Sequence, residues 1–431
     1  MHKKKTLAIL ILITVSMSLM AGGAPEQAGQ KAQADAAGPV RVLLSKGGSG
    51  TVIGNGIKAY AASSGKPVEI IEYPYAEVRE KQLLDLTSKA GDIDMISIDG
   101  PIWLAELNPF LDPIDSYIQR DKVDTGIFIG SMLDMFRAAG GKIFGLPVRI
   151  GGWVLIYRTD LFAAAGLKPP VTMDEFLSTA QKLSANNVYG FAAAFKQTNY
   201  LVAQWVPFLY SFGGNILDKD MKKAAFNEPK AIAATKFLID LFRVHKVVPP
   251  SAIDYEQTNL VTVMQQGLTA MAITYSPYFL VMNDPKTSKF PGKFAVSPVM
   301  PFDKASGLST GITELSGWGF GLNQASKRKD STWSLIKYMG SEATQRTLAV
   351  KYNNSPTVAS VYNDPDYLKV YPEAKAVLNS LSNAKSRPGV RQWTKIEDTL
   401  AKELSAAVNG LKTIEQALAD AEAQVNSILA Q

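Results

Sequence analysis

The sequence predicts an α/β protein built from two doubly wound lobes that are joined by crossings of the chain. Short apolar runs alternate with helix-like segments, a pattern typical of mainly parallel sheets covered by helices. The length of 431 residues exceeds the needs of one small core and fits two lobes. In addition, an apolar run follows the Gly151–Gly152 pair, as expected where the backbone crosses between lobes.

The first third of the chain predicts alternating strands and helices. We expect strands at 40–44, 68–72 and 95–98, and helices at 57–63 and 75–89. Ligand sites in doubly wound sheets lie beyond the carboxyl ends of the strands. The segments at those ends are 45–49, 73–75 and 99–103. We expect Asp92 and Asp94, by contrast, at the solvated start of their strand.

The segment 145–176 predicts a buried strand followed by a helix. Residues 153–157 are almost wholly apolar, and Gly151–Gly152 before them permits sharp backbone angles. Pro169–Pro170 prevents a helix from continuing. Thr172 with Glu175 three residues later forms a capping box, so the next helix begins at about Met173.

Later segments repeat this alternation. Residues 230–245 predict an amphipathic helix, and 267–273 predict a loop that enters a buried strand and ends at the aromatic segment 274–278. Near the end, Thr413 and Gln416 predict the start of a final helix. An apolar stripe predicts the helix before it: Ile396, Leu400, Leu404, Val408 and Leu411.

The N-terminus has the pattern of a secretory signal peptide. Charged residues 2–5 precede an apolar run at 7–20 and the small residues 21–23, so we predict a signal peptide at 1–23 and an exported, periplasmic protein. Cleavage there removes three of the 45 basic residues and none of the 39 acidic ones, which leaves a net charge of about +3. Residues 24–39 lack periodicity and predict a disordered leader.

Composition disfavours several classes of function. Basic residues are scattered rather than gathered in a stripe, which argues against a nucleic-acid partner. The chain has no cysteine, which excludes disulfides, thiolate catalysis, cysteine metal sites and a lipid anchor. After cleavage His245 is the only histidine, so no metal site or catalytic triad is expected.

Several blocks occur in the order typical of one family. They include VEIIEYPYAEVREKQLLDL, DIDMISIDGPIW, GKIFGLPVRIGGWVLIYRTDLFAAAGL, PFLYSFGG, GLTAMAITYSPY, SGWGFGL and RPGVRQWTKIEDTLAKELSAAVNGLKTIEQALADA. From about Val40 to Leu429 the chain resembles the extracellular solute-binding proteins of family 1, the maltose-binding-protein-like receptors of ABC importers.

The resemblance implies a periplasmic binding protein-like II fold with a sugar bound between the lobes. It implies a monomeric receptor that is not an enzyme, needs no cofactor or metal and delivers its ligand to ABC permease subunits. The expected lobes are 40–148 plus 318–352 and 152–314 plus 357–431, with crossings near 148–152, 315–317 and 352–356.

A sugar site needs flat aromatic surfaces together with groups that donate and accept hydrogen bonds. The predicted ligand-binding residues are Asp99, Trp318, Trp393, Tyr278, Trp153, Arg149, Trp205, Tyr75 and Tyr200. Trp318, Trp393 and Tyr278 match positions where relatives bind sugars. Asp99 can accept two hydroxyl protons or can instead cap the following turn, and each tryptophan can instead be a core residue, as we expect for Trp333.

One departure leaves the ligand open. Many relatives carry a carboxylate at the first crossing, where this chain has Gly151 and Gly152 with Arg149 nearby. Arg149 can clamp an anionic group or form a salt bridge between the lobes. The alternatives to a neutral sugar are therefore an anionic sugar derivative or other organic acid, and a glycan-degrading enzyme that uses two carboxylates.

Overall fold

The computed structural model describes residues 35–46, 48–381 and 383–431. The predicted signal peptide, 1–23, and residues 24–34 of the predicted leader lie outside the described residues. Within the described part, none of the helices combines the length and the apolar character needed to cross a bilayer.

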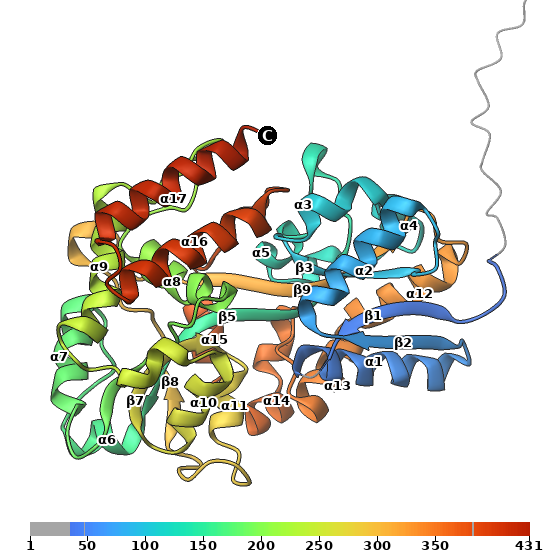
Figure 1. Cartoon of the computed structure of the whole chain (residues 1–431). Helices are drawn as coiled ribbons and strands as arrows, with labels where there is room; N and C mark the ends of the chain where they lie inside the picture. Colours follow the sequence, from blue (N-terminus) through green and yellow to red (C-terminus); the bar gives the residue numbers. More distant parts are fainter. Residues whose placement is uncertain (1–34, 47, 382) are drawn as a thin grey trace, which may run out of the picture. The chain divides into compact units, whose positions relative to one another are not determined.

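A path of seven strands runs through the fold (Figure 1). Its order is β2 (Val68–Tyr73), β1 (Val40–Ser45), β3 (Met95–Gly100), β9 (Glu314–Asn323), β5 (Leu146–Arg158), β7 (Thr269–Tyr275) and β6 (Tyr189–Ala192). Three short strands lie off the path: β4 (Leu111–Asp112) and β10 (Lys385–Ser386) pair with β9, and β8 (Phe294–Val296) pairs with β5. The predicted α/β class is confirmed.

The strands are less parallel than predicted. β1 is parallel to β2 and β3, and β6 is parallel to β7. β9, however, is antiparallel to both β3 and β5, and β5 is antiparallel to β7. An apolar run shows that a strand is buried but not its direction, so the sequence did not reveal the mixed arrangement.

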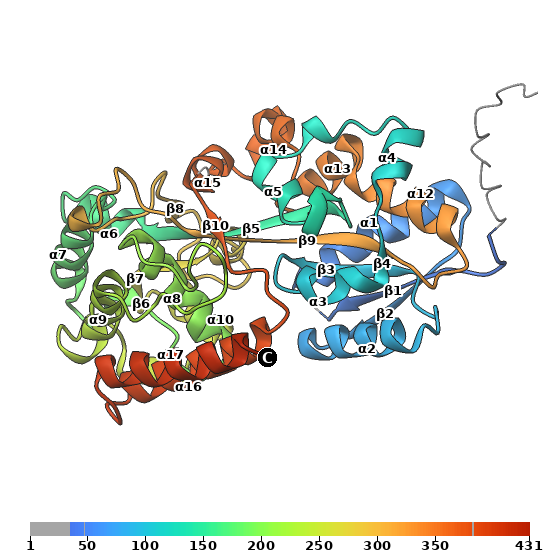
Figure 2. The ribbon, with the colours of Figure 1, turned by 90° about the horizontal axis from the view of Figure 1, so that it is seen from above.

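β5 and β9 are the long strands at the centre (Figures 1 and 2). The first half of β5, Leu146–Gly152, pairs with β9, whereas residues 153–157 pair with β7. Because of this change of partner, β5 links the strands on the β1–β3 side to those on the β7 side.

Gly151 and Gly152 lie inside β5 and not at a bend, contrary to the prediction of sharp backbone angles. Neither has a positive φ. A Cβ atom on Gly152 would overlap Cδ2 of Leu381 in α15 (Ala374–Leu381), and one on Gly151 would press on Ser316 of β9. The pair therefore serves the close approach of neighbouring elements to β5.

Helices cover both groups of strands. The helices of the first half are α1 (Gly48–Ser64), α2 (Tyr75–Ser88), α3 (Leu104–Leu107), α4 (Asp115–Arg120), α5 (Gly130–Asp134), α6 (Thr159–Ala164), α7 (Met173–Leu183) and α8 (Asn199–Ser211). Those of the second half are α9 (Pro229–Arg243), α10 (Gln257–Gln265), α11 (Tyr278–Met282), α12 (Lys329–Gly340), α13 (Glu342–Tyr352), α14 (Pro365–Val370), α15, α16 (Trp393–Val408) and α17 (Ile414–Leu429).

Short 3₁₀ helices fill several connections. They are η1 (Asn108–Phe110), η2 (Thr125–Ile127), η3 (Ala139–Gly141), η4 (Pro250–Asp254), η5 (Lys304–Ser306) and η6 (Ala359–Asn363).

The predicted helix at 75–89 is confirmed within one residue as α2, whereas the helix predicted at 57–63 is the second half of the longer α1.

Local capping confirms two predicted helix starts. The Thr172 hydroxyl accepts from the amide of Glu175, whose carboxylate accepts from the amide of Thr172, and α7 begins at Met173. Thr413 caps α17 in the same position. In α16 the apolar stripe is buried up to Val408, but Leu411 is 80% exposed because the helix has already ended.

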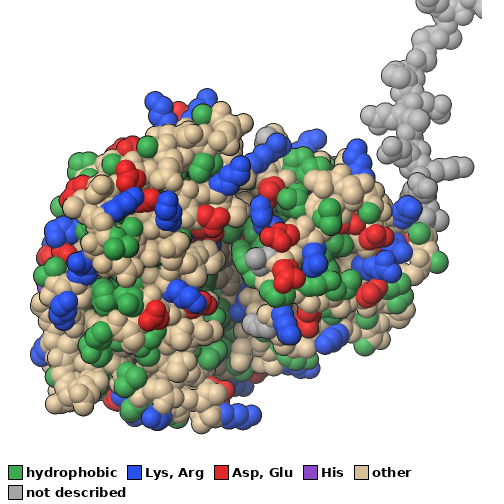
Figure 3. Space-filling model, viewed as in Figure 1, with side chains coloured by type: hydrophobic (Ala, Val, Ile, Leu, Met, Phe, Trp, Pro, Cys, Tyr) green, Lys and Arg blue, Asp and Glu red, His purple; other side chains and the backbone are tan. Residues whose placement is uncertain are grey.

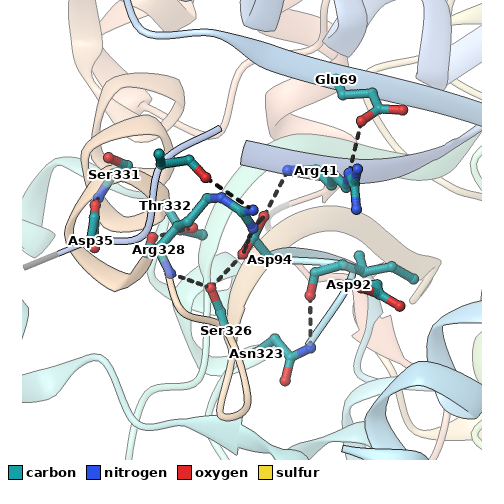
Figure 4. A network of polar contacts seen from close by, with 12 residues as sticks. Asp35, Arg41, Glu69, Asp92, Asp94, Asn323, Ser326, Arg328, Ser331 and Thr332 are labelled. Carbon is teal, nitrogen blue, oxygen red and sulfur yellow. Dashed lines mark hydrogen bonds and ion pairs between the residues drawn. The ribbon is translucent and has the colours of Figure 1, made fainter. Parts of the chain in front are cut away.

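A buried polar network ties α12 to the start of β3 (Figure 4). The Asp94 carboxylate accepts from the Arg41 amide at 2.9 Å, from the Ser326 hydroxyl at 2.6 Å and from the Arg328 guanidinium at 3.1 Å. Asp94 is fully buried, so our expectation of a solvated residue was wrong: the segment before α12 folds over this strand end.

The same region holds five residues that we predicted to be part of a disordered leader, 35–39. The Asp35 carboxylate accepts from the amides of Asp330 and Ser331 in the first turn of α12 (Figure 4). An acidic side chain at this end of a helix satisfies free amides and complements the helix dipole.

Trp333 of α12 is buried and donates to Asp121, which confirms it as a core residue.

Candidate functional site

A cavity of about 1390 Å³ is lined by residues from both groups of strands. The side near β3 contributes Tyr75 and Asp99, the side near β7 contributes Tyr200 and Tyr278, and the central strands contribute further residues. Figure 3 shows the surface hollowed between the two halves of the described fold. The volume exceeds the 300–1,000 Å³ common for small-molecule pockets, so it can hold more than one ring-sized group.

Three predicted site residues lie in one row across neighbouring strands. Trp318 of β9 pairs directly with Asp99 of β3 on one side and with Arg149 of β5 on the other. Residues that are directly opposite in an antiparallel pair project from the same face, with Cβ atoms about 5 Å apart. All three line the cavity. The register therefore presents a carboxylate, an indole and a guanidinium side by side.

The indole of Trp318 is held by two other aromatic rings. Trp103 meets it edge-on at 5.3 Å between ring centroids and Tyr75 does so at 5.9 Å. Tyr75 and Trp103 also contact each other, at 4.9 Å. Trp103 is buried, whereas Trp318 remains partly exposed towards the cavity. A fixed, partly exposed indole is a suitable surface for an apolar ligand face.

Asp99 is 7% exposed and accepts a hydrogen bond from the Tyr75 hydroxyl at 2.7 Å. Burial raises the pKa of Asp99 to about 6, against the lowering effects of the Arg387 charge and the Tyr75 hydrogen bond. The alternative of a helix cap is not found, since α3 has no side-chain cap. Asp99 is therefore largely ionised at pH 7 and can accept further hydrogen bonds.

A buried ionic cluster that the sequence did not reveal also reaches the cavity. Arg387 lines the cavity and donates to Glu314 at 2.9 Å and to Glu397 at 2.6 Å. Burial raises the pKa of both carboxyls, to about 7 for Glu397, while the Arg387 charge opposes the rise. Arg387 and Glu314 are 73 positions apart, a distance over which a single sequence shows no pairing signal.

Arg149 has a different environment. It is 8% exposed, lines the cavity and donates to the Asn354 side-chain oxygen at 3.3 Å. Residues 35–46, 48–381 and 383–431 place no acidic side chain within ion-pair distance of it. The salt bridge between lobes, one of the two predicted roles of Arg149, is thus not formed in the described part of the chain.

Two predicted tyrosines also reach the cavity. Tyr200, in the first turn of α8, shares a hydrogen bond with Thr274 at 3.0 Å, and Tyr278 begins α11. Both line the cavity on the β7 side. The cavity lining therefore includes six of the predicted residues, these two tyrosines together with Tyr75, Asp99, Arg149 and Trp318.

Three predicted tryptophans do not line the cavity and need correction. Trp205 is in the core, where its indole N–H donates to Thr235 at 2.8 Å, because this face of α8 packs on α9. Trp153 is buried in ring contact with Tyr200 and Tyr275, behind the wall. Trp393 is buried beside the Arg387 guanidinium, 5.8 Å from it.

Similarity in sequence places the chain in a known class. The sequence model of the family described as bacterial extracellular solute-binding protein matches residues 47–346, and the chain belongs to this family. A probable amino-acid ABC transporter periplasmic-binding protein of Sinorhizobium fredii is 26% identical and aligns over 90% of this chain and 89% of its own length. A probable ABC transporter-binding protein of Deinococcus radiodurans is also 26% identical, over 84% and 89%.

Solved structures agree with this class. Maltose-bound MalE3 of T. maritima has a TM-score of 0.81 at 27% identity, with 90% of this chain and 99% of that one covered. An ABC transporter solute-binding protein of Agrobacterium radiobacter, in complex with ribitol, has a TM-score of 0.81 at 25% identity, with 91% and 100% covered. The predicted two-lobe periplasmic binding protein-like II fold is confirmed.

Replacing Arg387 with glutamine leaves the carboxylates of Glu314 and Glu397 buried without their cation. We expect the free energy of unfolding of the ligand-free protein to fall by about 3–5 kcal/mol at pH 8, measured by chemical denaturation. Each of these carboxyls has a higher pKa in the folded protein than in the unfolded chain. Such a group lowers the free energy of unfolding as the pH rises from the unfolded pKa to the folded pKa. The loss at pH 5 should therefore be smaller, because both carboxyls can be protonated.

Arg346→Gln is the matched control, since the Arg346 side chain is 44% exposed and pairs with Asp364 and Asp366 at the surface. This variant should lose less than about 1 kcal/mol at either pH. Equal losses in the two variants, or a loss in Arg387→Gln that does not depend on pH, would contradict the assignment of a buried ionic cluster.

Proposed function

We propose that the chain is the solute-binding component of an ABC importer and that it binds a sugar or polyol in the cavity. The observation that carries the proposal is the row of Asp99 and Trp318, a carboxylate beside a partly exposed indole on one face of the sheet. The relatives support it, since the solved structures of similar chains contain maltose and ribitol.

The chemistry of the row suits a polyhydroxylated ligand. A sugar ring has apolar C–H faces that pack on an indole, and its hydroxyls donate strong hydrogen bonds to an ionised carboxylate. The Tyr200 and Tyr278 hydroxyls on the opposite side of the cavity can both donate and accept. The cavity volume of about 1390 Å³ also leaves room for an oligosaccharide.

An anionic sugar derivative or another organic acid is a second candidate for the same cavity. The observation in its favour is Arg149, a buried cation that lines the cavity with no acidic partner in the described part of the chain. The probable amino-acid binding protein among the relatives is compatible with a ligand that carries a carboxylate.

Trp318→Ala should weaken the binding of the best ligand by roughly ten- to a hundredfold. The reason is that burying the indole against the ligand contributes about 1–3 kcal/mol to the free energy of binding. Asp99→Asn should weaken it comparably by removing a charged acceptor. The ligand is first found by thermal shift against glucose, maltose, ribitol, mannitol and sugar acids, and affinities are then measured by calorimetry.

Trp333→Ala is the control for this experiment, since Trp333 is buried in α12. It should lower the free energy of unfolding by about 3–5 kcal/mol and leave the affinity of the folded protein nearly unchanged. If Trp318→Ala binds like the wild type but melts early, the site is misplaced. Recovery of shortened sugars from the wild-type incubation would instead indicate a glycan-degrading enzyme.

We also propose that the ligand closes the two lobes and that the closed monomer delivers it to the permease subunits. Contacts from both sides of the cavity exist together only in a closed form, so binding shifts the population towards that form. The proposed lobes are 40–148 plus 318–352 and 152–314 plus 357–431. Small-angle scattering should show a smaller radius of gyration with saturating ligand; an unchanged radius would rule out ligand-driven closure.

Export is proposed from the N-terminal pattern. Residues 1–23 are expected to be removed, so that the mature chain begins near Ala24 in the periplasm. N-terminal sequencing of protein released by osmotic shock tests this: a start near Ala24 is expected. Uncleaved protein recovered with the membranes would show that the segment is not a cleaved signal.

A further inference from the structure

Arg149 stands apart from the other buried arginines of the described residues. Arg158 pairs with Asp160, and Arg387 pairs with Glu314 and Glu397. The Arg149 guanidinium has five N–H donors and, among the described residues, donates one hydrogen bond, to the neutral Asn354 side chain. A buried cation without a counter-charge is destabilising, so a ligand that supplies the charge gains a large interaction.

The charge of Arg149 acts on the hydroxyls of three tyrosines. The hydroxyls of Tyr362 and Tyr367 are buried without a hydrogen-bond partner. The Arg149 charge opposes the rise in pKa that burial causes in both tyrosines, and also in Tyr278, so all three lie within its field. Burial lowers the pKa of Arg149 itself. Of the three tyrosines, Tyr278 lines the cavity, and its hydroxyl can donate to an anion there.

The opposite end of the row has the opposite character. Asp99 and Arg149 are on the two strands that flank β9, so their backbones are about 10 Å apart, twice the strand spacing. Trp318 lies between them, so a sugar ring on its indole has a carboxylate on one side and a guanidinium on the other. A molecule with hydroxyls at one end and a carboxylate at the other matches this order.

We propose that Arg149 is an anion subsite and that the solute is an acidic sugar, with its carboxylate on Arg149 and its hydroxyls on Asp99. This inference rests on the proposed function, since it specifies which sugars the cavity accepts. It makes Arg149 a specificity-determining residue: the missing counter-charge is provided by the ligand and not by the protein.

Matched neutral and acidic sugars test the subsite. The probes are glucose with gluconate and glucuronate, and galactose with galacturonate, titrated by calorimetry into wild type, Arg149→Lys and Arg149→Gln. Wild type should bind at least one acid about tenfold or more tightly than its neutral partner. Arg149→Gln should lose that preference, because the guanidinium that pairs with the carboxylate is gone. Arg149→Lys should retain part of the preference for the acid over its neutral partner.

Two controls separate an anion subsite from a structural role. Arg346→Gln removes a surface charge and should keep the preference for acids. Arg149→Gln should melt no earlier than wild type without ligand, because it removes an uncompensated buried charge; early melting of this variant would indicate a structural role and overturn the proposal.

The outcomes also distinguish this inference from the proposed function. Binding of neutral sugars with no gain for the acids, or a preference that survives Arg149→Gln, overturns the anion subsite and leaves a sugar receptor. Failure of every sugar, polyol and sugar acid to bind overturns both.

Discussion

The pairing of β9 between β3 and β5 is the constraint on which the site depends. It aligns Asp99, Trp318 and Arg149 in one row, and a shift of the register by one residue would turn Trp318 to the other face of the sheet. The alternate residues of β9 secure the register. Gly317 lies against Met132, and Gly319 lies against Phe136. A Cβ atom on either glycine would overlap that side chain. One face of β9 is thus fixed by packing, and the other is free to carry the site.

Charge is distributed unevenly around this strand. Arg387 also lines the cavity, but two buried glutamates neutralise it within the protein. Arg149 is equally inaccessible to solvent but is not neutralised by any described residue, although it reaches the cavity. The two arginines show why burial alone does not identify a binding residue. The difference lies in whether the protein or the ligand completes the electrostatic environment.

Local signals in the sequence predicted much of the fold and part of the site. The capping box at Thr172 and the apolar run at 153–157 were sufficient because both depend on neighbouring residues. Asp99 could be proposed because it ends a buried strand, and Trp318 because it matches a position where relatives bind sugars. Trp205 could not be assigned correctly, since α8 is buried from Tyr200 to Ser211 and has no polar face to show its orientation. Glu314 and Arg387 were missed because their contact depends on tertiary structure.

The central claim is that the row on β3, β9 and β5 receives the solute. A crystal structure of the protein with its tightest-binding sugar acid tests this claim most directly. The account predicts a sugar ring over the Trp318 indole, hydroxyls hydrogen-bonded to Asp99 and the carboxylate within about 2.8 Å of the Arg149 guanidinium. A ligand bound elsewhere in the cavity, or bound on Trp318 with its carboxylate directed away from Arg149, would contradict it.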